Sequence, residues 1–176
     1  MDNSFWQYIS RLELLAFFSG YPLVYAIIMV FFGNKNKGKK FPIKISSYLP
    51  YAYALSGTLY FGLILRNLYP DYSIKNIGGF FDHSYLKIWA MLSLFFWIPL
   101  LAKKPVISLL HSLLFFIYLI KDAFLYNSSL SGRDMIKNET KIYTISILLN
   151  IITLTAIVLL YFLIIILRKN KSASQR

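Results

Sequence analysis

The run from Ile142 to Leu167, IYTISILLNIITLTAIVLLYFLIIIL, constrains the fold more than any other feature, because it contains no charged residue. At about 1.5 Å per residue, a helix of this length exceeds the hydrocarbon core of a bilayer, which is about 30 Å thick. The run lacks the alternation of apolar and polar residues that is typical of a half-buried strand. Because backbone groups in lipid must be satisfied within their own segment, we expect a transmembrane helix here.

Four further apolar runs precede it, and the third is the shortest. They are Leu12–Phe32, Ile45–Leu65, Tyr85–Leu101 and Pro105–Tyr126. The composition agrees, since 57% of residues are hydrophobic and 15% are charged, against about 25% charged in soluble domains. The sequence therefore predicts an all-α integral membrane protein: one domain over residues 1–176, with five transmembrane helices and a basic tail at 168–176. A re-entrant third run would place the C-terminus on the other side.

The basic residues divide unevenly between the two sides of this bundle. Eleven of the 19 fall in the loop after the first run, at Lys103-Lys104 and in the C-terminal tail, which five crossings place on one side. All seven acids fall on the other side. This bias predicts an outside N-terminus and a cytosolic C-terminus in the cell (inner or plasma) membrane. The basic residues flank the runs without interleaved aromatic residues, so we expect no nucleic-acid partner.

His111 is a histidine inside a predicted helix, and an ionisable side chain within a span is a candidate functional group. Counting from Pro105 puts it about 9 Å from the cytosolic end, near the depth of Tyr53 and in the same half as Trp97. Asn150 falls nearer the outer end, so we do not expect it to contact His111. Two interpretations remain: a neutral imidazole bonded to a neighbouring helix, or a group that handles a proton or a ligand.

A second candidate set gathers at the predicted outer face. Its members are Arg11, Glu13, Asp82, His83, Lys87, Lys121 and Asp122. These charges bind a small polar solute or a partner if they converge, and otherwise they lie in water as ordinary juxtamembrane charges. Glu13 falls inside an apolar run, at a depth where Lys87 or Lys121 could pair with it. His83 and His111 lie at different depths and cannot share an ion, so we predict no metal site and no cofactor.

Small and polar residues mark helix-packing faces, and one helix has a predicted kink. Ala54, Thr58 and Gly62 recur at every fourth position, a spacing that lets helices approach closely within the chain or between subunits. Two further polar sets have helical spacing: Ser108 and Ser112, and Ser146, Asn150 and Thr153. Gly20-Tyr21-Pro22 predicts a kink in the first helix.

Three functions remain open. The chain has no cysteine, no glycine-rich phosphate loop and no hydrolase motif, which favours a non-enzymatic subunit that anchors or packs against a larger membrane complex. Its partners would be the lipid bilayer and a membrane protein or a second copy. The alternative is a small transporter or channel for protons or a small solute, using His111, Tyr53 and Asn150. The third is an intramembrane lipid-modifying enzyme, which the dispersed outer acids disfavour.

Overall fold

The chain is mainly helical in the part described by a computed structural model, which comprises residues 3–32, 45–70, 72, 85–126 and 132–173. In chain order the elements are α1 (Asn3–Phe18), α2 (Tyr21–Phe32), the 3₁₀ helix η1 (Ile45–Tyr48), α3 (Leu49–Leu68), α5 (Tyr85–Met91), the 3₁₀ helix η2 (Leu92–Trp97), α6 (Pro99–Ala102), α7 (Pro105–Tyr126) and α8 (Gly132–Ala173). These residues include no strand, so the predicted all-α class is confirmed.

Two stretches are long and apolar enough to cross a membrane: Arg11–Phe31, across α1 and α2, and Thr140–Lys171 in α8. The apolar stretches Tyr85–Trp97 and Pro105–Lys121 are shorter. The bounds of α7 coincide with the predicted run 105–126, and Pro105 occupies the first helical position, where its missing N–H is not needed. By length and composition, the fold thus supports two of the five predicted spans.

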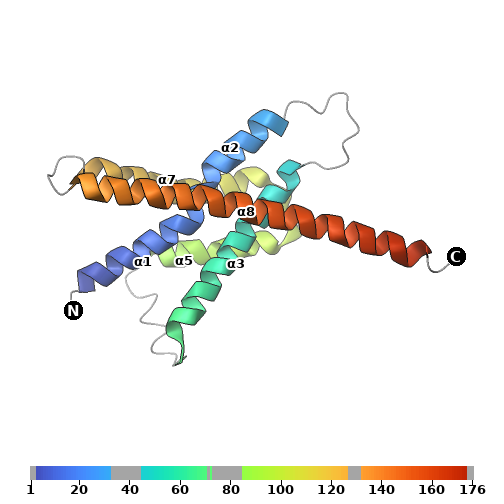
Figure 1. Cartoon of the computed structure of the whole chain (residues 1–176), viewed down its shortest axis with the longest axis horizontal. Helices are drawn as coiled ribbons and strands as arrows, with labels where there is room; N and C mark the ends of the chain where they lie inside the picture. Colours follow the sequence, from blue (N-terminus) through green and yellow to red (C-terminus); the bar gives the residue numbers. More distant parts are fainter. Residues whose placement is uncertain (1–2, 33–44, 71, 73–84, 127–131, 174–176) are drawn as a thin grey trace.

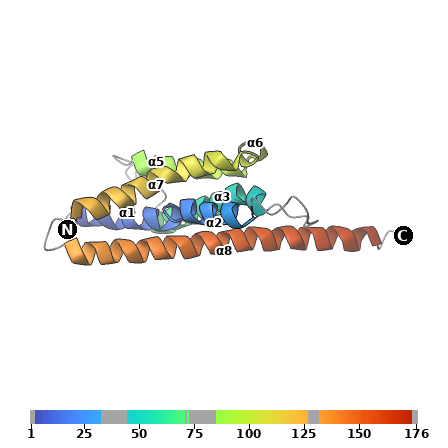
Figure 2. The same ribbon diagram turned by 90° about the horizontal axis from the view of Figure 1, so that it is seen from above.

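The helices pack in layers (Figure 2), and α1, α2 and α3 cross α8 obliquely (Figure 1). In Figure 2, α8 lies along one face, α7 lies with α5 and α6 on the opposite face, and α1, α2 and α3 lie between them. α1 starts near the end of the molecule where α8 starts, and the end of α8 projects past the other helices at the opposite end (Figure 1).

The first apolar run is broken at Ser19 and Gly20, as the Gly20-Tyr21-Pro22 motif predicted. α1 ends at Phe18 and α2 begins at Tyr21. Pro22 has no N–H, so the carbonyl of Phe18 loses the donor that a continuous helix would provide. The break is therefore a direct consequence of the proline.

The third apolar run is not the single α-helix that was predicted over Tyr85–Leu101. It changes to a 3₁₀ helix at Leu92 and is interrupted at Ile98, whose backbone is extended (φ −73°, ψ 122°). Pro99 causes this interruption, because its ring disfavours the helical conformation for the preceding residue. A 3₁₀ helix rises about 2.0 Å per residue against about 1.5 Å for an α-helix, so η2 lengthens this leg by about 3 Å.

The buried core is rich in aromatic side chains and lies where α1, α2, α3, η2 and α7 meet. Its aromatic members are Phe18, Tyr21, Tyr25, Tyr53, Tyr60, Phe96 and Phe115. Between Ser146 and Ile157, α8 contributes one buried face to the bundle, whereas every side chain from Leu159 to Lys171 is exposed. The described part of the chain thus leaves the last turns of α8 uncovered.

Candidate functional site

His111 lies on the inward face of α7, with 8% of its surface exposed. The buried residues Ser108, Ser112, Phe115 and Leu119 follow the same face at three- to four-residue spacing, the period of a helix packed along one stripe. α7 thereby directs the imidazole toward α3 on one side and toward α5 and η2 on the other.

Aromatic rings enclose the imidazole. The Trp89 ring of α5 stacks on it, with centroids 4.7 Å apart and planes at 8°, and the Trp89 indole N–H donates to the His111 carbonyl at 3.1 Å. Phe96 and Tyr53 present their edges at 5.8 and 5.6 Å, and Phe115 lies at 6.0 Å. We call these residues (Tyr53, Trp89, Phe96, His111 and Phe115) the His111 cluster.

The two imidazole nitrogens differ in their hydrogen bonding. Nδ1 shares a 2.7 Å hydrogen bond with the Tyr53 hydroxyl, which confirms the contact predicted between these two residues. Nε2 is buried and has no hydrogen-bond partner among the described residues. A buried polar atom without a hydrogen bond destabilises the folded protein. Nε2 is therefore the atom of this cluster for which a function beyond packing should be tested.

Sequence reasoning missed Trp89 and considered Trp97 instead. The Trp97 indole N–H donates to the Thr58 hydroxyl at 2.9 Å, and its ring lies 6.3 Å from that of Tyr51. No signal in the sequence identified Trp89 as the residue stacked on His111.

As predicted, Asn150 does not contact His111. Its side chain instead forms a hydrogen bond with the C-terminal end of α1, where the first apolar run is broken. Its side-chain amide donates to the carbonyl of Phe17 at 3.0 Å and to that of Ser146 at 2.8 Å. The Phe17 carbonyl stands one residue before the end of α1. Asn150 thus supplies a donor at a helix break, as neighbouring helices do for interrupted helices in membranes.

Ser146 completes this attachment, because its hydroxyl accepts a 2.8 Å hydrogen bond from the Gly20 N–H. A Cβ on Gly20 would lie 2.5 Å from the backbone nitrogen of Ile147. The missing side chain therefore lets the break lie directly on α8. The polar stripe predicted on the fifth helix is a packing face, and both hydrogens of the Asn150 amide are used within the chain.

A second polar contact joins α2 to α7. The Tyr21 hydroxyl and the Ser108 hydroxyl lie 2.7 Å apart, and Ser108 donates to the Pro105 carbonyl, also at 2.7 Å. Because a serine has one hydroxyl hydrogen, Tyr21 is the donor of this pair. Within the described part of the chain, no hydrogen bond connects this link to the Tyr53–His111 pair, so the buried polar groups form separate short links.

The predicted outer set is only partly described. Asp82 and His83 lie outside the described residues. Glu13 is half-buried and interacts electrostatically with Lys87, one of the two lysines predicted to pair with it. The Arg11 guanidinium lies over the Tyr118 ring at 5.7 Å, within cation–π range. Among the described residues, no group of three histidine or acidic side chains could hold a metal ion.

The predicted small-residue stripe of α3 divides into a buried and an exposed part. Ala54 is buried, but Thr58 and Gly62 are exposed, and a Cβ on Gly62 would meet no atom within 4 Å. Within the chain, close approach uses Gly57, where a Cβ would collide with the Ser93 hydroxyl. Among the described residues, Gly62 therefore takes no part in close helix packing, whereas Thr58 contacts η2 through its hydrogen bond with Trp97.

No protein-family model, curated protein or solved structure matches this chain.

Proposed function

We propose that this chain is a non-enzymatic, multi-pass subunit of the cell membrane, with five spans and a cytosolic C-terminus, that packs against a larger membrane complex. One observation carries the proposal: the segment Leu159–Leu167 of α8 is apolar and uncovered by the described residues. From Leu159 to Leu167 all its side chains are apolar or aromatic and exposed. A helix that is apolar all round needs lipid or protein around it.

The position of this segment favours protein. The Tyr161 ring lies 5.0 Å from that of Tyr48 in η1, so Tyr161 stands level with the start of the second proposed span. The six residues Phe162–Leu167 continue for about 9 Å beyond that level, where the projecting end of α8 is visible in Figure 1. An apolar segment beyond the ends of its neighbours calls for an apolar cover, which the described residues do not provide.

The hydrogen bonds of the buried polar groups also support a structural role for this chain. Asn150, Ser146 and Ser108 are engaged in hydrogen bonds that join helices, and in lipid such bonds stabilise helix association. The exposed Gly62 offers a small-residue position of the kind at which another transmembrane helix packs closely, one turn after Thr58, whose hydroxyl binds Trp97.

Affinity purification of the full chain in mild detergent, followed by mass spectrometry, tests this proposal. We expect a membrane protein recovered in stoichiometric amount from wild-type chain, and reduced recovery with Leu163→Asn. The matched control Leu148→Asn alters an α8 leucine of equal exposure, 54% for both side chains, outside the projecting segment. A chain that purifies alone from its own membrane would contradict the proposal.

A second candidate function, the transport of protons or of a small solute, is favoured by one observation, the unpartnered Nε2 of His111. Flux into proteoliposomes that is abolished by His111→Ala would support it. Flux that is absent, or that is unchanged by both His111→Ala and Asn150→Ala, would exclude a path through these residues.

A further inference from the structure

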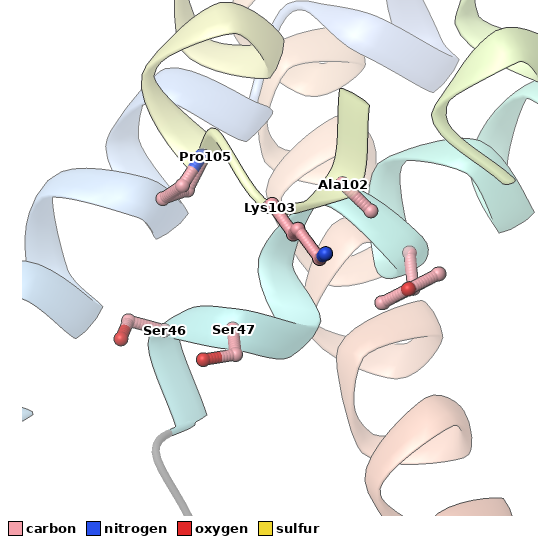
Figure 3. A pocket seen from close by; sticks show the side chains of 6 residues that line it. Ser46, Ser47, Ala102, Lys103 and Pro105 are labelled. Carbon is pink, nitrogen blue, oxygen red and sulfur yellow. The ribbon is translucent and has the colours of Figure 1, made fainter. Parts of the chain in front are cut away.

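A cavity of about 280 Å³ lies where η1 and the start of α3 face the turn between α6 and α7. Its lining residues are Ser46, Ser47, Tyr51, Ala102, Lys103 and Pro105. In Figure 3 the Lys103 side chain extends from the turn, and the side chains of Ser46 and Ser47 lie on the neighbouring η1 with their hydroxyls turned away from it. The volume is near the lower end of the range typical of ligand sites, about 300–1,000 Å³.

The polar groups of this cavity are all suited to an anion. Lys103 supplies a positive charge, and the hydroxyls of Ser46 and Ser47 supply donors. Neither serine makes a hydrogen bond to another described residue, unlike the serines buried between the helices, such as Ser108 and Ser112. No acidic residue lines the cavity, so an anion would meet no opposing charge there.

The charges of neighbouring residues in the sequence also favour an anion over a cation. Lys104 follows Lys103 in the turn, Lys44 directly precedes η1 in the sequence, and all seven acids lie in segments proposed to face the other side of the membrane. Pro105 begins the 22-residue α7, whose N-terminal dipole adds to the positive potential. Beside the cavity, Leu100 and Val106 are exposed, which gives the site an apolar border.

We propose that this cavity binds a phosphate group, with the Lys103 ammonium as its charged ligand and with the Ser46 and Ser47 hydroxyls, once their side chains turn to another rotamer, as further donors. The apolar border and the proposed cytosolic position favour the headgroup of an anionic phospholipid as the source. Free inorganic phosphate shares the same chemistry. The inference rests on the proposed membrane topology only for the source of the phosphate, and it is independent of any protein partner.

Native mass spectrometry of the full chain, purified in detergent, tests the site. The probes are phosphatidylglycerol, phosphatidylcholine and inorganic phosphate, and the variants are Lys103→Gln, the pair Ser46→Ala with Ser47→Ala, and the control Lys104→Gln. Lys104 is an equally charged, exposed neighbour that does not line the cavity. Circular dichroism confirms that each variant keeps its helices.

We expect phosphatidylglycerol to bind more tightly than phosphatidylcholine, with a loss of about fivefold to tenfold for Lys103→Gln and less than about twofold for Lys104→Gln. Competition by inorganic phosphate at millimolar concentration would support the site and identify the bare phosphate as sufficient. Lack of competition, with the Lys103 effect retained, would support it and identify the lipid as the source. Equal losses for the two lysine variants, or no preference for the anionic lipid, would overturn the proposal.

Discussion

The Tyr53 hydroxyl lies 2.7 Å from Nδ1 of His111 and joins α3 to α7 inside an aromatic enclosure. Tyr53 is fully buried, so neither partner can exchange this bond for one to water. The pair is therefore a structural link, whatever Nε2 does.

Tyr53→Phe should destabilise the protein by about 1–2 kcal/mol, because it leaves Nδ1 without its partner. The double variant Tyr53→Phe with His111→Phe should lose less than the sum of the two single variants, since both ends of the bond are then apolar. Thermal unfolding in detergent measures this, with Tyr85→Phe as an exposed control. If the stability losses of the two single variants add exactly to that of the double variant, the bond contributes nothing to stability.

Gly20→Ala should destabilise the bundle by about 1–3 kcal/mol, because the added Cβ meets the backbone of α8 rather than a movable side chain. The control is Gly62→Ala, where the Cβ meets no atom within 4 Å and removal of a helix-interior glycine should stabilise by up to about 1 kcal/mol. Unfolding temperatures of the two variants should move in opposite directions. Equal shifts would contradict the contact between Gly20 and α8.

Asn150→Ala should lower stability by about 1–2 kcal/mol, because the carbonyls of Phe17 and Ser146 lose their common donor. Thr155→Ala, on the exposed face of the same helix, should change it by less than about 0.5 kcal/mol. Proteolysis of the purified protein checks the location of the effect. Cleavage near the break between α1 and α2 should increase in Asn150→Ala alone.

The five-span topology predicts that Tyr69 lies outside and Lys104 in the cytosol. The chain has no cysteine, so single-cysteine variants can be labelled without background. In intact cells, a membrane-impermeant maleimide should label Tyr69→Cys at once and Lys104→Cys only after permeabilisation. Labelling of both in intact cells would refute this topology.

The sequence predicted those features that depend on local chemistry. Pro22 beside Gly20 indicated the break in the first run, Pro105 indicated the start of α7, and equal depth indicated the Tyr53–His111 contact. Each of these follows from the missing N–H of proline or from counting residues along a regular helix.

Features that depend on the exact path of the backbone could not be predicted. Trp89 rather than Trp97 stacks on His111, because depth along a helix does not define the direction in which a side chain points. Gly57 and Gly62 lie about 140° apart around α3, and only the rotation of α3 about its axis decides which one faces Ser93. Spacing along one helix defines a face but not the helix that lies against it.

The central claim, that a partner protein covers the projecting segment Leu159–Leu167 of α8, is tested most directly by a photo-crosslinking residue placed at Leu163 and, separately, at Leu148. Both leucines belong to α8 and are 54% exposed, and their directions around the helix differ by about 60°. The account predicts a protein adduct of one defined mass from Leu163 in native membranes, and lipid adducts alone from Leu148. Lipid adducts alone from both positions would contradict it.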